Sequence, residues 1–151
     1  IGGFSQALIE AEGTAAELFN DIQFARAEAV ARNQPTRLTL GTNCYVIHIP
    51  VTSTANATCS VTGGTSLRTV TVEDPSAVAL AASSPLTGLM FDTVRGEATL
   101  DGMPSTDNEA SINITTPASV SQDFRLRAVV SKYGRVQLCT PNAMTGYASC
   151  S

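Results

Sequence analysis

The residues of this chain that have reactive side chains do not form a recognisable catalytic pattern. His48 is the only histidine, so a Ser-His-Asp or Cys-His site would have to use its imidazole. It lies in the middle of a hydrophobic run, which favours an ordinary strand residue over a general base. The carboxylates are scattered, with Glu73 and Asp74 in one turn and Asp92 and Glu97 flanking another. We therefore expect no enzyme, no catalytic residue and no cofactor.

Four cysteines form the second group of chemically capable residues: Cys44, Cys59, Cys139 and Cys150. There is no CxxC motif and only one histidine, so no ligand set has zinc-finger spacing and we expect no metal. An even number of cysteines at these intervals indicates two local disulfides, Cys44–Cys59 and Cys139–Cys150. Each would stabilise the fold by about 3 kcal/mol in the chain-entropy model and would require an oxidising compartment. Crossed pairings remain compatible with the sequence.

Composition and charge limit the classes of partner. The chain has 151 residues, 43% of them hydrophobic, which is enough for one domain with its own core. Its formal net charge of -4 argues against a general nucleic-acid binder. Up to residue 110 there are five basic and twelve acidic residues, whereas from residue 111 there are four basic residues and one acidic residue. That asymmetry leaves nucleic acid open as a partner. No run approaches the roughly 18 apolar residues of a membrane span.

The element around which the chain is organised is a predicted helix over residues 14–33. Its apolar residues recur at three- and four-residue steps and predict a buried stripe: Leu18, Phe19, Ile22, Ala25, Ala29 and Val30. Thr14 and Glu17 have the spacing of a capping box, and Pro35 cannot continue a helix. We expect residues 1–13 to be a loose lead-in.

Short strands follow the predicted helix. Runs rich in β-branched residues, separated by turn residues, predict strands within residues 36–139: 36–40, 45–51, 67–72, 78–81, 89–91, 111–116, 124–131 and 135–139. Residues 52–65 and 101–109 are polar and predict surface loops, and residues 140–151 predict a looped tail tied back by the second disulfide. One helix followed by a sheet that covers its stripe is an α+β plan, here in a single domain over residues 1–151.

Three motifs resemble a known family. The stretch IQFARAEAVARNQPTRLTL, residues 22–40, resembles the helix-to-first-strand signature of the FimT/FimU/GspH family of type IV minor pilins and type II secretion pseudopilins. Its ARSEA-type motif stands at residues 25–29, with Ala27 in place of the usual serine, and is followed by Arg32 and Asn33. Residues 88–96, GLMFDTVRG, are similar to the family's apolar-Phe-x-x-x-Gly strand and turn, and residues 134–139, GRVQLC, to its C-terminal Gly-Arg strand. The motifs keep the family order.

The resemblance implies a type IV pilin-like fold, in which an amphipathic half-helix lies on antiparallel sheet in the periplasm. It also implies a hydrophobic half-helix, missing from this sequence, that anchors the protein in the bacterial inner membrane and later packs in a filament. The expected function is that of a non-enzymatic minor pilin in the priming and tip of an extracellular type IV pilus. Other minor pilins and the major pilin would be its partners. Methylation, twitching motility and DNA uptake are further family properties.

Assembly would require surface contacts along the helix. Phe19, Gln23 and Arg26, on a flank of the predicted helix, are the candidate subunit contacts, although a solvated face explains them equally well. On this assignment Ile22→Asp should unfold the domain, and Arg26→Glu should leave its stability nearly unchanged.

DNA binding is the alternative function. Some FimT-like minor pilins are associated with DNA uptake through a C-terminal Gly-Arg-x-Arg element. Gly134 and Arg135 match it, but Gln137 stands where the second arginine is expected, which removes one phosphate contact. The candidate DNA-binding residues are Arg125, Arg127, Lys132 and Arg135. A third hypothesis, a type II secretion pseudopilin, shares the fold; the C-terminal cysteine pair looks more like that of the pilus members.

Overall fold

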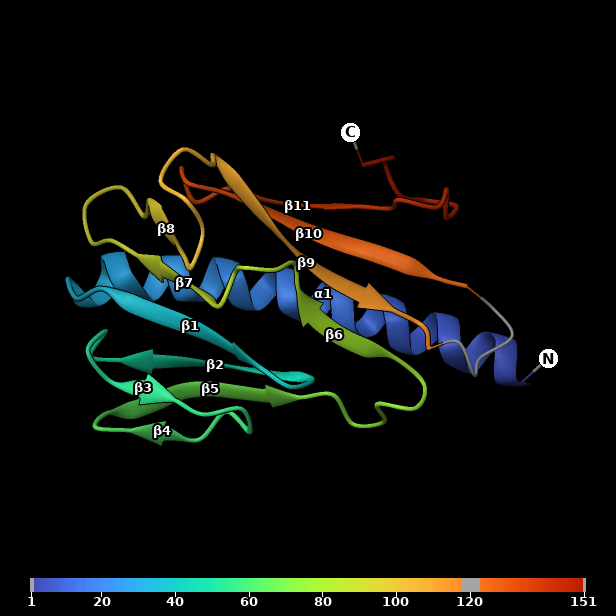
Figure 1. The fold of residues 1–151 in the computed structure, drawn as a ribbon, viewed down its shortest axis with the longest axis horizontal. Coiled ribbons are helices and arrows are strands. Elements are labelled where there is room, and N and C mark those ends of the chain that lie inside the picture. The colour runs from blue at the N-terminus through green and yellow to red at the C-terminus, as the bar shows by residue number, and fades with distance from the viewer. Residues whose placement is uncertain (1, 118–122, 151) are drawn as a thin grey trace.

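The structure, a computed structural model, describes residues 2–117 and 123–150 of the chain. Within these residues one long helix is followed by short antiparallel strands, which confirms the predicted α+β order. Helix α1, Gly2–Arg32, runs along the longest axis of the molecule and lies behind the strands in Figure 1. Two main sheets cover α1, so each has one face towards the helix and one face away from it.

Helix α1 begins far upstream of the predicted start. Its first residue is Gly2, so the expected loose lead-in over residues 1–13 is wrong for the residues that are described, and Thr14 and Glu17 lie inside the helix instead of capping it. The buried stripe continues upstream from Leu18 at three- and four-residue steps, through Ala15, Ala11 and Ala7. Burial of this stripe offsets the low helix propensity of the nearby glycines, about 1 kcal/mol each.

The end of α1 agrees with the prediction to within one residue. Asn33 has a left-handed φ of 51°. Its N–H donates to the carbonyl of Val30, and the N–H of Gln34 donates to that of Ala29, both at 3.2 Å. This pair of bonds is a Schellman motif, which satisfies the last carbonyls of the helix, and Pro35 follows it.

The stripe that α1 buries is largely the predicted one. Leu18, Ile22, Ala25 and Ala29 are completely buried. Val30 is wrong as a core residue, because 49% of its surface is exposed.

Five strands form the first sheet, in the order β5-β2-β1-β7-β8, with every neighbouring pair antiparallel. Their bounds are β1 Thr36–Gly41, β2 Cys44–Ile49, β5 Thr65–Thr71, β7 Gly88–Phe91 and β8 Ala98–Asp101. Leu38, Tyr45 and Ile47 are fully buried in the main core with α1. Strand β8 was not predicted, because its four residues contain only two apolar side chains.

Four strands form the second sheet, in the order β11-β10-β9-β6. Their bounds are β6 Ala79–Ala82, β9 Glu109–Thr115, β10 Arg125–Ser131 and β11 Val136–Cys139. Alternate residues of β9 and β10 are buried in the core, including Ile112, Ile114 and Leu126. The residues between them lie on the outer face, away from α1.

A small hairpin covers the outer face of β2. It consists of β3, Thr54–Ala55, and β4, Val61–Thr62, inside the segment that was predicted to be a polar loop. Val46 of β2 packs with Ala55 and Val61 around the Cys44–Cys59 disulfide. Two-residue strands carry too little periodicity for sequence analysis to detect.

Candidate functional site

Helix α1 has a second stripe, on the side away from the core, that carries no charged residue. We call it the outward stripe; its residues are exposed and recur at three- and four-residue steps: Gln6, Ile9, Gly13, Ala16, Asn20, Gln23, Phe24, Ala27 and Ala31. Ile9 is 66% exposed and Phe24 is 37% exposed. The solvent-facing side of a helix in a globular protein is normally charged or polar. An uncharged stripe in which most side chains are small or apolar indicates a contact surface.

Only one of the three candidate subunit contacts lies on the outward stripe. Gln23 is exposed and belongs to it. Phe19 is half-buried at the side of α1, where it lines a hollow with Val136 and Leu138 of β11. Arg26 is half-buried and turned towards the sheets.

Arg26 joins three segments of the fold. Its Nε donates to the carbonyl of Gly96 at 3.2 Å and its Nη2 to that of Arg95 at 3.3 Å, both in the β7–β8 turn. Gly134 of the β10–β11 turn lies against the same contact between Arg26 and Gly96. A Cβ atom on Gly134 would lie 2.1 Å from the Gly96 oxygen and 2.9 Å from Arg26 Nε. Arg26 therefore positions two turns, and the expectation that its substitution leaves stability unchanged must be revised.

A buried carboxylate that the sequence analysis missed links α1 to the first sheet. Asp21 is 5% exposed. It accepts a hydrogen bond from the Tyr45 hydroxyl at 2.6 Å and forms an ion pair with Arg68 Nε at 2.6 Å. Burial, followed by the bond to Asp21, raises the pKa of Tyr45. Glu17 adds a second ion pair to Arg68 at 3.0 Å. The sequence held no signal for this cluster, since Arg68 lies on a distant strand.

His48 is a fully buried strand residue with both ring nitrogens bonded. Its Nδ1 lies 2.7 Å from Ser53 Oγ, and its Nε2 lies 2.7 Å from Thr39 Oγ1. The Ser53 hydroxyl donates its single hydrogen to the carbonyl of Pro50, so Ser53 Oγ must accept from Nδ1–H. In neutral His48 the Thr39 hydroxyl then donates to Nε2. A histidine that donates to a serine cannot activate it as a nucleophile.

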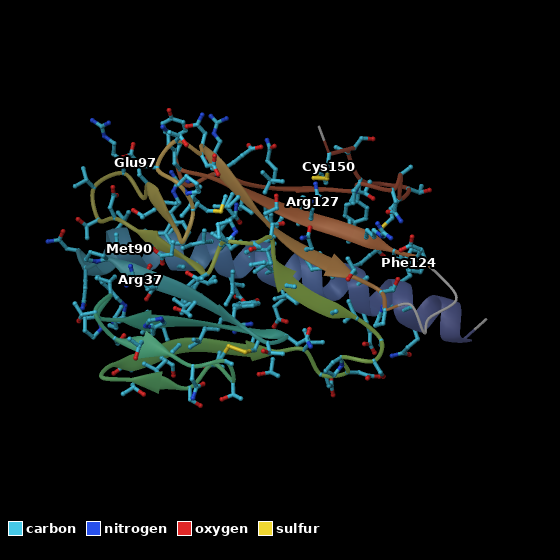
Figure 2. The ribbon with its side chains drawn as sticks, viewed as in Figure 1. Arg37, Met90, Glu97, Phe124, Arg127 and Cys150 are labelled. Carbon is cyan, nitrogen blue, oxygen red and sulfur yellow. A yellow bond between two sulfur atoms is a disulfide. The ribbon has the colours of Figure 1, made fainter. Side chains whose placement is uncertain are left out.

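The surroundings of His48 favour its neutral form. Burial lowers the pKa of His48, and the guanidinium of Arg37 lowers it further, while Asp101 opposes both. Arg37 of β1 is itself held by Asp101 of β8 at 3.1 Å and by the sulfur of Met90 at 3.6 Å, on the neighbouring strand β7. Figure 2 labels Arg37 and Met90.

The candidate DNA-binding residues fall into two groups at opposite ends of β10. Arg125 pairs with Asp123 at 3.1 Å, and Arg127 donates to Asn113 at 3.0 Å. Lys132 follows the other end of the strand and lies 5.6 Å from the centre of the Tyr133 ring. A strand of this length spans roughly 20 Å.

Arg135 belongs to the second of these groups. It lies opposite Ser131, whose N–H donates to the Arg135 carbonyl at 2.9 Å. Glu109 lies opposite Ser131 on the other side, so a carboxylate shares this row of the outer face with Arg135. The basic patch that the sequence suggested is therefore divided and includes a negative charge.

Both predicted disulfides are confirmed, Cys44–Cys59 and Cys139–Cys150. The second ties the end of the tail back to Cys139 of β11, and within the tail the Tyr147 hydroxyl donates to Glu12 of α1 at 2.9 Å. Burial, followed by this bond, raises the pKa of Tyr147 to about 12.

Two properties concern the described residues as a whole. In residues 2–117 and 123–150 no cluster of three or more His, Cys, Asp or Glu side chains has an arrangement that could hold a metal ion. In the same residues no helix is both long and apolar enough to cross a membrane.

The comparisons with known proteins settle the family. The model of the family described as type II transport protein GspH matches residues 14–134, which is most of the chain. The chain belongs to the GspH family. The matched range contains the helix motif, the 88–96 motif and the glycine that opens the third motif, so the resemblance to minor pilins and pseudopilins is confirmed. In this GspH-family chain Arg26, Gly96 and Gly134, one residue from each motif, meet at a single point.

Two solved structures have the same fold as this GspH-family chain. Both are crystal structures of the type IV minor pilin FimU of Pseudomonas aeruginosa PAO1. The one in space group P65 is 18% identical, has a TM-score of 0.60, and the match covers 90% of this chain and 98% of FimU. The one in space group P21 is 17% identical, with a TM-score of 0.62 and 97% of each chain covered. At these identities the match shows the fold alone, and it confirms the expected pilin fold. No curated protein has a significantly similar sequence.

Proposed function

We propose that this GspH-family chain is a non-enzymatic minor pilin that takes part in the priming and assembly of a type IV pilus and lies at its tip. The observation that supports this proposal is the outward stripe of α1. The helix buries one stripe against the sheets of its own domain and presents a second, uncharged stripe to the outside. A subunit that packs by its helix against other helices needs two such faces.

The small side chains of the outward stripe suit this role. Ala16, Ala27 and Ala31 add little bulk, so the backbone of a second helix can approach closely. Phe24 and Ile9 supply apolar area, which contributes about 25 cal/mol for each Å² removed from water. A charge at the centre of the stripe would have to be desolvated in the contact, at a cost of several kcal/mol.

Partners and location follow from the same proposal. The contacts of α1 would be with other minor pilins and with the major pilin, and the domain would lie in the periplasm before it enters the pilus. We favour the pilus over type II secretion because the solved structures that match over nearly the whole chain are those of a type IV minor pilin.

Substitution of one residue of the outward stripe in the full-length protein tests the proposal. In a strain that lacks its own copy, Ala27→Glu should reduce the number of surface pili at least tenfold by electron microscopy. Thr62→Glu, at a position on β4 that is also exposed, is the matched control and should leave piliation normal. The melting temperatures of both purified domains should match that of the wild type.

Two results would count against the proposal. Normal piliation with Ala27→Glu would show that the outward stripe is not an assembly surface. Normal piliation combined with loss of type II secretion would assign the chain to a secretion pseudopilus instead.

A further inference from the structure

Strand β11 forms one edge of the second sheet, and this edge is only partly covered. Thr140, directly after the strand, turns its backbone outward: its N–H donates to Ala148 O at 2.8 Å, and its carbonyl accepts from Cys150 N at 3.0 Å. Outward-facing backbone groups recur at every second residue of a strand, so Val136 and Leu138 also turn their N–H and C=O to the edge. Among the described residues no bond occupies these four groups. In the part of the tail that the structure describes, the main-chain hydrogen bonds to this edge are made at Thr140 alone.

A hollow of about 540 Å³ lies along this open edge. On the side towards α1 its lining is apolar, with Phe19 of the helix beside Val136 and Leu138. On the outer side it is lined by Gln137 and Cys139, by residues of β9 and β10, and by the tail: Glu109, Ser111, Arg127, Val129, Ala148, Ser149 and Cys150. A chain lying in this hollow would find apolar contacts on one side and polar contacts on the other.

The outer side beside the edge carries positive charge. Arg135 is exposed and lines an adjoining hollow of about 510 Å³ with Tyr133 and Gln137. No ion pair of the residues that the structure describes involves Arg135. Arg127 lines the first hollow, in the region where Figure 2 shows it with Cys150 over the second sheet. Among the described residues on the outer face beside the edge, Arg135 is the one charged residue next to β11, whereas Arg127 on β10 and Glu109 on β9 lie farther from the edge and offset each other.

We propose that the open edge of β11 is a docking site for an extended segment of a partner protein whose side chains alternate between apolar and acidic. The partner segment adds a strand to the second sheet and continues the pairing that the tail begins at Thr140. This surface lies on the sheets and goes beyond assembly through the outward stripe of α1, on which it does not depend.

Strand addition explains why the side chains of the partner segment must alternate between apolar and acidic. Bonds between main chains supply affinity but no sequence preference, and alternate side chains point to opposite faces of the new strand. Side chains on the inner face contact Phe19, Val136 and Leu138, so they must be apolar. Side chains on the outer face lie beside Arg135, and an opposite charge stabilises a cross-strand pair.

Other occupants fit this edge less well. A second copy that paired β11 with β11 would offer Arg135 no carboxylate, because Val136–Cys139 contains none. A nucleic acid has no main-chain N–H and C=O groups with which to extend the sheet, and among the described residues it would find one exposed cation, Arg135, next to the edge. A nucleic acid would also leave the row of apolar side chains on the inner side unused.

Amide hydrogen exchange measured by NMR on the 151-residue chain tests the proposal. The probe is a capped nine-residue peptide of alternating glutamate and valine, and the control peptide has lysine in place of glutamate. The glutamate peptide should slow exchange of the Val136 and Leu138 amides at least tenfold, whereas the Gln137 amide, which faces β10, should change much less. The lysine peptide should bind at least tenfold more weakly.

Variants make the test specific to the edge. Leu138→Pro removes an outward N–H without removing a bond to β10, a position where edge strands accept proline, and it should weaken binding at least tenfold. Arg135→Glu should reverse the preference between the two peptides, and Arg125→Glu, at the far end of β10, should leave it unchanged. If Leu138→Pro does not fold, Arg135→Glu alone decides the question.

Four results would overturn the proposal. The first is no change in the Val136 and Leu138 amides, and the second is an unchanged preference in Arg135→Glu. The third is protection of the same amides by self-association without any peptide, which would assign the edge to a second copy. The fourth is salt-dependent binding of a duplex DNA that is lost in Arg135→Glu, which would assign the surface to nucleic acid.

Discussion

Arg26 illustrates how much the role of a residue depends on contacts that its own helix does not reveal. Its place in the helix motif suggested a solvent-facing contact, but its guanidinium lies against the carbonyls of Arg95 and Gly96. A bond from a charged donor to a carbonyl contributes more than a neutral one, typically about 1.5–3 kcal/mol before exposure is taken into account.

Replacing Arg26 by methionine keeps the aliphatic part of the side chain and removes both hydrogen bonds. Because Arg26 is partly exposed, we expect the free energy of unfolding to fall by about 1–2 kcal/mol, measured by urea denaturation. Arg32→Met is the matched control; it removes only the exposed ion pair with Glu28 and should cost less than about 0.5 kcal/mol. Equal stabilities of the two variants would mean that Arg26 does not hold the turns.

His48 should make the stability of the domain depend on pH in the mildly acidic range. Burial and Arg37 lower its pKa in the folded state, whereas the unfolded chain has the ordinary value of about 6.5. The unfolded state then binds the proton more tightly, so this contribution to stability is fully present above pH 6.5 and is lost as the pH falls towards the folded pKa. Urea denaturation between pH 7.5 and 5.0 should show the loss.

His48→Gln provides the control for this dependence. Glutamine does not titrate, so the variant should be less stable than the wild type at pH 7.5 and should have a flatter profile down to pH 5.0. A wild-type profile that is flat, or that rises as the pH falls, would contradict a neutral buried His48.

At the scale of elements, the hydrophobic periodicity of the sequence predicted the elements whose own side chains show which face is buried. The stripe from Leu18 to Ala29 was visible because leucine and isoleucine stand out at helical spacing. Its extension through Ala7 and Ala11 was not visible, because alanine carries little hydrophobic signal and its burial becomes clear only once the sheets are in place. Strand β8 was missed for a similar reason: its four residues show little hydrophobic pattern, and the strand forms by pairing with β7.

The candidate surfaces were predictable to a smaller extent than the fold. Sequence motifs identified the family, and the number and spacing of the cysteines indicated both disulfides. Gln23 stays a candidate contact residue, on the outward stripe. The outward stripe could not be separated from an ordinary solvated face before the true length of α1 was known. The open edge of β11 depends on strand order, which no residue pattern specifies.

Neighbouring residues of α1 should respond very differently to the same substitution. Ile22 is completely buried, so Ile22→Asp places a carboxylate in the core and should destabilise the domain by about 4 kcal/mol or more. Gln23 is exposed on the outward stripe, so Gln23→Asp should cost less than about 1 kcal/mol. Circular dichroism melts of the two variants compare them directly; the opposite order of stability would reverse the assignment of the two helix faces.

The C-terminal disulfide should hold the tail against α1. Replacing Cys139 and Cys150 together by serine should lower the free energy of unfolding by about 2–3 kcal/mol. Release of the tail also removes the bond between Tyr147 and Glu12, so the pKa of Tyr147, now about 12, should return towards its ordinary value. Spectrophotometric titration of the tyrosines measures this shift. An unchanged titration would show that the tail stays docked without its disulfide.

At the scale of the whole molecule, the two proposed contact surfaces belong to different parts of the fold. The outward stripe follows α1 on the side away from the sheets, and the open edge of β11 lies on the second sheet (Figure 1). A subunit with this arrangement can pack by its helix in a filament while its sheet edge engages a further protein. A tip subunit of a pilus would need both kinds of contact.

Site-specific crosslinking tests helix-mediated assembly most directly. A photoreactive amino acid is placed at position 23 of the full-length protein, on the outward stripe, and in a second variant at position 62, on the exposed hairpin. After irradiation of cells that form pili, position 23 should crosslink to another pilin subunit and position 62 should not. Crosslinks to pilins from position 62 alone, in cells that form pili normally, would contradict assembly through the outward stripe of α1.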